Sequence, residues 1–339
     1  MNSPTVLITG GAGFVGSCLV RQLIAADTVD VVNLDLLTYA GNLAYLGDAN
    51  SSPRHTFIHG DICDGALVKN LLEKHRPTAI MHLAAESHVD RSIAAPRTFA
   101  ETNVLGTVTL LEAVRDYWKT LDGEEQEVFR FLHVSTDEAY GSIPEGQFAI
   151  ESTAYAPNSP YSASKAASNH LVRAFHQTYG LPTLIVNSSN NFGPCQNPEK
   201  LIPAMILRAA SNQALPLYGD GLHVRDWLYV EDHIRALLLV LEKGRIGDVY
   251  NIGGNNLRTN IEVVEQICNI LDRIQESKNS SRELITFVAD RPGHDRRYAL
   301  DSHKAHRELG WSPQMNFDEG LELTVRWYLE NTQMFESGK

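Results

Sequence analysis

Short hydrophobic runs recur along the first half of the chain, and helix-length segments separate them. The runs are rich in branched side chains and lie at residues 6–8, 31–34, 56–58, 79–83, 129–134 and 183–186. Strands that are covered on both faces have this composition, and their alternation with helices is typical of βαβ units. The pattern therefore predicts an α/β fold built on a doubly wound parallel sheet.

The rhythm of the pattern changes after residue 188. Residues 201–212, 232–243, 261–274 and 317–330 have helical spacing, and residues 249–252 have the pattern of a strand. We expect a first domain of residues 1–188, to which residues 224–253 return, and a smaller mixed α/β C-terminal lobe, mainly residues 189–339, that binds the substrate. The polar runs at residues 122–127 and 275–281 predict exposed loops.

Length and charge narrow the class of protein. The 339 residues are 43% hydrophobic, which is enough for one large core or two modest ones. The formal net charge of -12 argues against partners such as nucleic acid or an anionic membrane, because such surfaces gather Lys and Arg. No basic segment precedes the first hydrophobic run, and no apolar run approaches about 18 residues. We therefore expect a cytoplasmic protein.

The four cysteines have no spacing that suggests metal binding. Cys18, Cys63, Cys195 and Cys268 lie far apart, without a CxxC pair or a Cys/His ligand pattern. Such spacing argues against a zinc site and against a disulfide framework. We expect reduced thiols that pack, and no metal.

A glycine-rich turn follows the first predicted strand and opens an apolar helical segment. It consists of Gly10, Gly13, Phe14, Val15 and Gly16 with two intervening small residues. Glycines at this turn let a pyrophosphate approach the helix N-terminus, where free N–H groups and the helix dipole favour negative charge. A tight turn without a ligand is the structural alternative. The context favours a Rossmann-type dinucleotide site.

Acidic residues after the next two strands indicate which dinucleotide binds. Asp35 lies 19 positions after Gly16, close to the spacing of about 20 for a carboxylate that binds the ribose hydroxyls. Its charge would repel a 2′-phosphate, and residues 36–39 contain no arginine, so we expect NAD rather than NADP. Asp61 could bond the adenine amino group, with a capping aspartate as the alternative.

Two further clusters suggest acid–base chemistry. Tyr161 and Lys165 are four positions apart, so on a helix they share one face, where the lysine can lower the pKa of the phenol and make it a base. Thr136 precedes the adjacent carboxylates Asp137 and Glu138. The alternatives are an amphipathic helix start and a solvated acidic turn.

The glycine turn together with Tyr161-x-x-x-Lys165 resembles the extended short-chain dehydrogenase/reductase family, whose members work on nucleotide sugars. Within that family the chain resembles the dTDP-glucose 4,6-dehydratases from the first strand to Trp327. The matching segments are Ser135-Thr136-Asp137-Glu138, Asn190-Asn191-Phe192-Gly193-Pro194, and residues 198–203, 224–230 and 290–297.

This resemblance implies one site that oxidises C4 of glucose with NAD, eliminates water across C5 and C6, and reduces C6. Asp137 would be the acid at O6 and Glu138 the base at C5, while Tyr161, supported by Lys165 and Thr136, would take the O4 proton. The resemblance also implies a homodimer through helices near residues 102–117 and 162–179, although their apolar faces could pack internally.

Further site residues follow from the resemblance alone. Ile62 and Ala84 would complete the cofactor site. Arg225 and Arg291 would contact the diphosphate, for which planar guanidinium groups are suited. The remaining expected substrate contacts are Ser87, Thr136, Asn190, Glu199, Lys200, Asn260 and His294. Ala139 stands where the family commonly has valine, and Phe192 stands where it usually has tyrosine.

Two alternative functions remain. A 4-epimerase or decarboxylase of the same family would share the cofactor site and Tyr161 with Lys165. Oxidation at C4 alone does not need an elimination pair, so Asp137 and Glu138 argue against an epimerase. A noncatalytic NAD-binding regulator would have no reason to keep all four residues.

Overall fold

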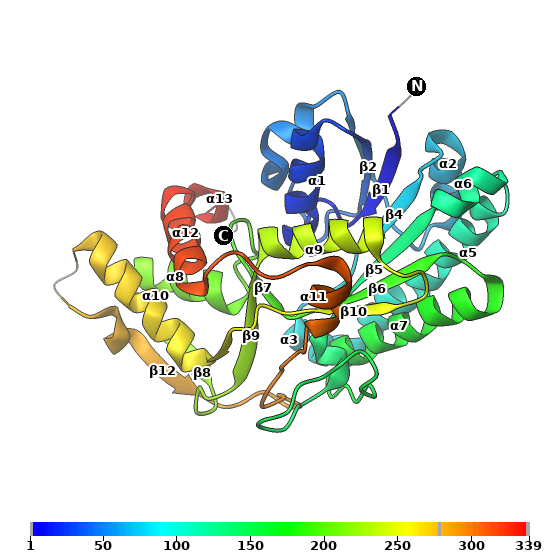
Figure 1. The fold of residues 1–339 in the computed structure, drawn as a ribbon. Helices are drawn as coiled ribbons and strands as arrows, with labels where there is room; N and C mark the ends of the chain where they lie inside the picture. Colours follow the sequence, from blue (N-terminus) through cyan, green and yellow to red (C-terminus); the bar gives the residue numbers. More distant parts are fainter. Residues whose placement is uncertain (1–2, 277–278, 337–339) are drawn as a thin grey trace.

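The computed structural model describes residues 3–276 and 279–336. Its centre is a seven-stranded parallel sheet with strand order β10-β6-β5-β4-β1-β2-β3 (Figure 1). Each of the six predicted hydrophobic runs lies in one strand or reaches past its end, which confirms the predicted α/β fold. The strands are β1 (Thr5–Thr9), β2 (Asp30–Asp35), β3 (His55–His59), β4 (Ala79–His82), β5 (Arg130–Thr136), β6 (Thr183–Ser188) and β10 (Val249–Ile252).

Helices cover both faces of this sheet, so its strands are buried on two sides (Figure 1). Val6 and Ile8 of β1 face one core and Leu7 faces the other, as the alternation of side chains along a strand requires. The first core includes α1 (Phe14–Ala26), α9 (Val230–Lys243) and α11 (His303–Leu309). The second includes α2 (Gly65–His75), α5 (Thr107–Trp118) and α7 (Pro160–Tyr179).

One predicted loop is instead a helix. Residues 122–127 lie largely in α6 (Gly123–Val128), where the side chains of Asp122 and Glu125 cap each other's backbone N–H groups. This capping box stabilises a short polar helix that hydrophobic periodicity cannot reveal. The other predicted loop begins within α10, whose last residue is Gln275, and residues 277–278 lie outside the described chain.

Short elements connect the strands of the large sheet. They are η1 (Leu43–Ser51), α3 (Val89–Ala94), α4 (Pro96–Phe99), the π-helix η2 (Ala100–Gly106) and η3 (Asp137–Tyr140). Among them, η3 follows β5 directly and α3 follows β4 after residues 83–88, at the carboxyl edge of the sheet.

The C-terminal lobe combines two small sheets with helices around a separate core. Its strands are β7 (Asn190–Phe192), β8 (Leu215–Tyr218), β9 (Val224–Tyr229), β11 (Leu257–Thr259) and β12 (Ile285–Val288), ordered β11-β9-β7 and β12-β8. Its helices are α8 (Leu201–Ala210), α10 (Asn260–Gln275), η4 (Ser281–Leu284), α12 (Phe317–Glu330) and α13 (Gln333–Glu336). Within residues 224–253, β9 belongs to a small sheet, whereas α9 and β10 belong to the large sheet and its core. The domain boundary at residue 188 is a proposal.

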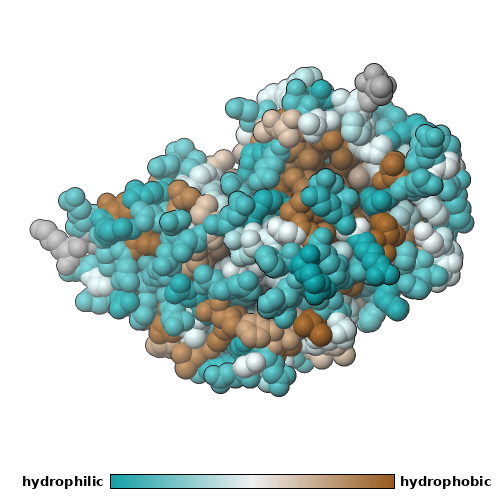
Figure 2. All heavy atoms as spheres, viewed as in Figure 1, coloured by the Kyte–Doolittle hydropathy of each residue, from teal (hydrophilic) through white to brown (hydrophobic). Residues whose placement is uncertain are grey.

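The surface is mainly hydrophilic on the face in Figure 2, with hydrophobic residues in separate patches. Within residues 3–276 and 279–336, no helix combines the length and the hydrophobicity that crossing a bilayer requires.

Candidate active site

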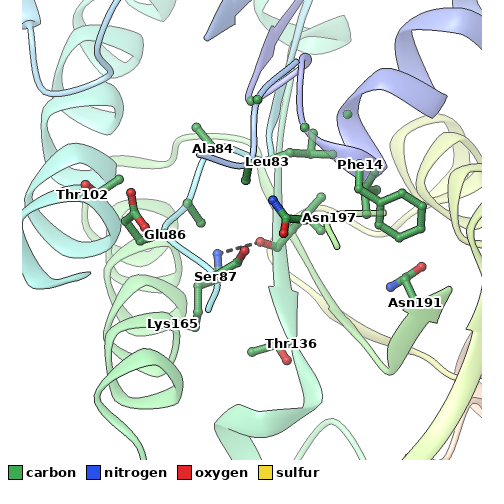
Figure 3. A pocket seen from close by; sticks show the side chains of 18 of the residues that line it. Phe14, Leu83, Ala84, Glu86, Ser87, Thr102, Thr136, Lys165, Asn191 and Asn197 are labelled. Carbon is green, nitrogen blue, oxygen red and sulfur yellow. Dashed lines mark hydrogen bonds between the residues drawn. The ribbon is translucent and has the colours of Figure 1, made fainter. Parts of the chain in front are cut away.

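The carboxyl ends of the parallel strands surround a cavity of about 300 Å³ (Figure 3). This is the position where open parallel sheets bind ligands. Many predicted site residues line it together: Gly10, Gly13, Phe14, Val15, Gly16, Asp35, Asp61, Ile62, Ala84, Ser87, Thr136, Asp137, Glu138, Tyr161, Lys165, Asn190 and Lys200. Five others do not line this cavity: Glu199, Arg225, Asn260, Arg291 and His294.

The glycine turn forms a cradle that fits a dinucleotide. Gly13 is the N-cap of α1, and no side chain caps the helix or adds an acidic group to its first turn. A Cβ at Gly13 would meet only the carbonyl oxygen of Gly10, at 3.4 Å, whereas a Cβ at Gly16 would lie 2.0 Å from that oxygen. The space over Gly13 is thus open to a pyrophosphate, and Gly16 allows the close packing beneath it.

Asp35 is preorganised at the end of β2. Its Oδ2 accepts the N–H of Ala12 and its Oδ1 accepts the N–H of Leu37, both at 2.8 Å. Each carboxylate oxygen keeps a lone pair for a ribose hydroxyl. Asp61 also lines the cavity, and its Oδ1 accepts the N–H of Cys63 at 2.9 Å. Asp61 therefore bonds a local backbone N–H and faces the cavity at the same time.

Tyr161 and Lys165 lie on the first turns of α7, where Ser159 and Ser162 form a capping box. The Lys165 ammonium donates to the carbonyl oxygen of Val134 at 2.8 Å, and burial lowers the pKa of Lys165 to about 7. Burial raises the pKa of Tyr161. Desolvation thus dominates the pKa of both groups, and the role of Lys165 in lowering the pKa of Tyr161 stays a prediction.

Asp137 and Glu138 follow β5 at the start of η3. Burial raises the pKa of Asp137 well above its usual range, and the charges of Glu138 and Asp226 raise it further. Burial also raises the pKa of Glu138, but nearby cations oppose this, Arg291 most strongly and then Lys200. The two neighbouring carboxyls thus have unequal surroundings, as an acid and a base in one site require.

The cations nearest Glu138 belong to the C-terminal lobe. Lys200 donates to the carbonyl oxygen of Ser87 at 2.6 Å. Arg225 is buried, donates to the carbonyl oxygen of Asp295 at 3.0 Å, and lies 4.2 Å from the ring centroid of Tyr298.

Two of the remaining lobe residues, Arg291 and Glu199, have protein partners. Arg291 donates to Asp90 at 3.4 Å, and its buried Nε has no hydrogen-bond partner among the described residues. Glu199 pairs with Arg91, and the buried Oδ1 of Asn260 is without a hydrogen-bond partner in the described chain. Arg291 and Asn260 therefore keep polar atoms free for a ligand.

His294 belongs to a cluster that the sequence did not indicate. Asp290 accepts from Nδ1 of His294 at 2.6 Å, and its other carboxylate oxygen lies 3.2 Å from Nε2 of His223. The three ligand atoms lie within 4.8 Å of one another, but the two rings stack at 3.6 Å with an interplanar angle of 14°. Nearly parallel rings direct their nitrogen lone pairs side by side rather than toward one point, so the geometry suits a shared carboxylate better than a metal ion.

Several lining residues were not predicted, because nothing in their type or spacing marks them. They are Leu36, Thr38, Gly41, Glu86, Thr102, Ser189, Gln196, Asn197 and His233, among others. Asn191 also lines the cavity, and although it lies in a matching segment it was not named as a site residue. In Figure 3, Glu86 and Thr102 lie across the cavity from Asn197 and Asn191.

The departure at Phe192 has a packing explanation. Its ring is buried against Trp227, Tyr229 and Phe317, at centroid distances of 6.3, 5.5 and 5.1 Å. A hydroxyl at this position would need a partner inside the hydrophobic core of the lobe. Phenylalanine therefore suits the site without removing a cavity residue.

Comparison with known proteins identifies the family. Residues 7–324 match the family model described as GDP-mannose 4,6 dehydratase. A dTDP-glucose 4,6-dehydratase from Shigella flexneri is 56% identical over 343 residues, covering 98% of this chain and 95% of that protein. The chain belongs to the dTDP-glucose 4,6-dehydratase family. A relative of the same name from Xanthomonas campestris pv. campestris (strain B100) is 57% identical over 329 residues, covering 96% and 93% of the two chains.

Solved structures agree with this family. The dTDP-glucose 4,6-dehydratase DesIV from Streptomyces venezuelae, crystallised with NAD and TYD bound, has a TM-score of 0.91 and 47% identity, covering 99% of this chain and all of that one. A UDP-glucose 4-epimerase from Thermotoga maritima, crystallised with UDP-glucose, has a TM-score of 0.84 and 30% identity, covering 97% and 99%. The epimerase shares the extended short-chain dehydrogenase/reductase fold at lower identity.

Lys165 should make the stability of the protein depend on pH. Its pKa falls from 10.5 to about 7 on folding, so between these pH values the unfolded chain binds more protons than the native protein. The free energy of unfolding contributed by this group therefore rises with pH across that window. We predict that Lys165→Met gains stability over the wild type as pH falls from about 10 to about 7, measured by thermal denaturation.

The exposed Lys69 provides the control, and Lys69→Met should follow the wild type at every pH. A stability difference between Lys165→Met and the wild type that stays constant with pH would contradict the prediction.

Proposed function

We propose that the protein is an NAD-dependent hydro-lyase that converts dTDP-glucose to dTDP-4-keto-6-deoxyglucose and water. The observation that carries the proposal is the position of Asp137 and Glu138 in the same cavity as Tyr161 and Lys165. An oxidising site alone would not need two adjacent carboxyls with raised pKa values. The relatives named dTDP-glucose 4,6-dehydratase support the choice of substrate.

The residues divide the reaction among them. Tyr161 takes the O4 proton as C4 is oxidised, with the Thr136 hydroxyl lowering the pKa of the phenol. A bound nicotinamide supplies the hydride acceptor for C4 and the hydride donor for C6. Glu138 then removes the C5 proton, which the new ketone acidifies, and Asp137 protonates O6 as it leaves as water. Glu138 returns a proton to C5 after C6 is reduced.

The expected cofactor is NAD rather than NADP, because the predicted ribose site contains a negatively charged carboxylate. Asp35 would repel a 2′-phosphate, and the unblocked N-terminus of α1 would receive the pyrophosphate. Lys200, Arg225 and Arg291 would meet the diphosphate of the sugar nucleotide. We place the reaction in the cytoplasm, for which the four unpaired cysteines are an argument.

The first experiment follows two labels. The protein is incubated with NAD and dTDP-glucose that carries deuterium at C4, and the products are analysed by mass spectrometry and NMR. We expect a product lighter by one water, with the C4 label at C6 and, in D₂O, solvent deuterium at C5. A product that is only the C4 epimer would refute the dehydratase assignment, and so would no turnover across dTDP-, UDP-, GDP- and CDP-glucose.

Replacing Asp137 should separate the steps. Asn is isosteric with Asp but cannot deliver a proton, so Asp137→Asn should slow water loss by about 10²- to 10⁴-fold and C4 oxidation far less. In a single turnover, the absorbance of reduced nicotinamide should then accumulate. The exposed Asp48 gives a matched control, Asp48→Asn, that should behave as the wild type. Equal slowing of both steps would remove Asp137 from the acid role.

We also propose a homodimer formed through the outer faces of η2, α5 and α7. The inner faces of α5 and α7 pack in the second core, and Leu105 of η2 is 59% exposed. Light scattering should give twice the chain mass of 37.6 kDa. Leu105→Glu should weaken the dimer, whereas Leu222→Glu, on the other lobe and 45% exposed, should not. A monomeric wild type would contradict the proposal.

A further inference from the structure

The segment of residues 87–91, at the start of α3, connects the large sheet to the C-terminal lobe. It lies shortly after β4, and four of its five residues contact the lobe through polar groups. The contacts are Ser87 O with Lys200 at 2.6 Å, His88 with Glu199 at 3.7 Å, Asp90 with Arg291 at 3.4 Å and with Tyr218 at 3.1 Å, and Arg91 with Glu199. The lobe is therefore bonded to a segment whose first residue, Ser87, lines the cavity.

Arg91 binds two partners from different parts of the chain. Its guanidinium lies over the ring of Tyr39, 4.0 Å from the centroid. Its Nε donates to Oε2 of Glu199 at 3.0 Å, and a second nitrogen donates to the other carboxylate oxygen. A guanidinium can do both because its face stacks while its edge donates. We call Tyr39, Arg91 and Glu199 the arginine clasp.

The arginine clasp joins two segments that line the cavity. Segment 38–41 follows Asp35 of the predicted ribose site, segment 196–200 belongs to the lobe, and both contribute lining residues. Asn197 adds a second bond between them, because its Nδ2 donates to the carbonyl oxygen of Tyr39 at 3.1 Å. Asn197 lies across the cavity from Glu86 (Figure 3). Opening the cavity between these segments would require these contacts to break.

The proposed reaction gives such a closure a purpose. The hydride taken from C4 is the one that C6 receives, so exchange of the dinucleotide with solvent between the two steps would end the turnover with an oxidised sugar. A dehydrogenase that consumes its cofactor must release it in every cycle. This site instead gains from slow release.

We propose that the arginine clasp retains the bound nicotinamide dinucleotide by holding segment 38–41 against the C-terminal lobe. The inference rests on the proposed function. It also changes the interpretation of Glu199, which the family resemblance placed at the substrate. Both carboxylate oxygens of Glu199 bind Arg91, so Glu199 is a positioning residue that acts through the arginine.

The test measures cofactor release without any sugar. Protein loaded with NADH is mixed with excess NAD in a stopped-flow instrument, and the loss of NADH fluorescence gives the dissociation rate. Arg91→Met should release NADH about tenfold faster, the scale expected for one two-pronged ion pair and one cation–π contact. Arg91→Lys should lie between it and the wild type, because lysine keeps the charge but cannot form the planar fork.

Arg97→Met is the matched control, because Arg97 pairs with Glu101 on the exposed side of the neighbouring helix. It should release NADH at the wild-type rate. Combining Glu199→Gln with Arg91→Met should add little acceleration, since both remove the same pair. Equal release rates for wild type and Arg91→Met would overturn the arginine clasp, whatever the sugar assay gives. A wild type that binds no NADH would overturn the proposed function, and the clasp with it.

Discussion

The burial of two neighbouring carboxyl groups at the end of β5 is the constraint on which the site depends. Burial raises the pKa of both Asp137 and Glu138, and the charge of Glu138 raises the pKa of Asp137 further. Cations oppose this for Glu138, in the order Arg291, Lys200 and Arg225. For Asp137, Arg225 is the main cation that acts in that direction. The difference in pKa between two residues of the same chemistry comes from this unequal supply of positive charge.

Those cations do not come from the large sheet. They lie on β9, at the start of α8 and in the segment before Asp295. The two carboxyls therefore have their neighbouring cations only when the lobe packs against the large sheet. Docking in turn uses the same cations, since Lys200 bonds Ser87 and Arg291 bonds Asp90. The contacts that assemble the lobe therefore also set the charge around the carboxyls. An acidic chain can in this way gather positive charge where a diphosphate must bind, without a basic surface.

The sequence predicted the seven strands of the large sheet because short, branched hydrophobic runs mark them, and it predicted the lining of the cavity where motifs fix residues to strand ends. It did not predict the strands of the two small sheets, β7, β8, β9, β11 and β12. It failed where stability comes from local capping, as in α6, none of whose residues is buried. It also missed the contacts of Asp90 and Arg91, since neither residue belongs to a spacing rule and their partners in the lobe lie 108 to 201 residues further along the chain. Glu199 was found by resemblance, but resemblance identifies a residue and not its partner.

The pKa of Tyr161 is also set by burial and by neighbouring charges, which here are negative. Burial, Glu138 and Asp137 all raise the pKa of the phenol, and the Thr136 hydroxyl lowers it. Burial also lowers the pKa of Lys165 to about 7, and its ammonium donates to the carbonyl oxygen of Val134. Burial therefore disfavours the charged form of both groups. The spacing of Tyr161 and Lys165 places them on one face of α7, but their protonation depends on how much water the surrounding protein removes from them, which a spacing cannot reveal.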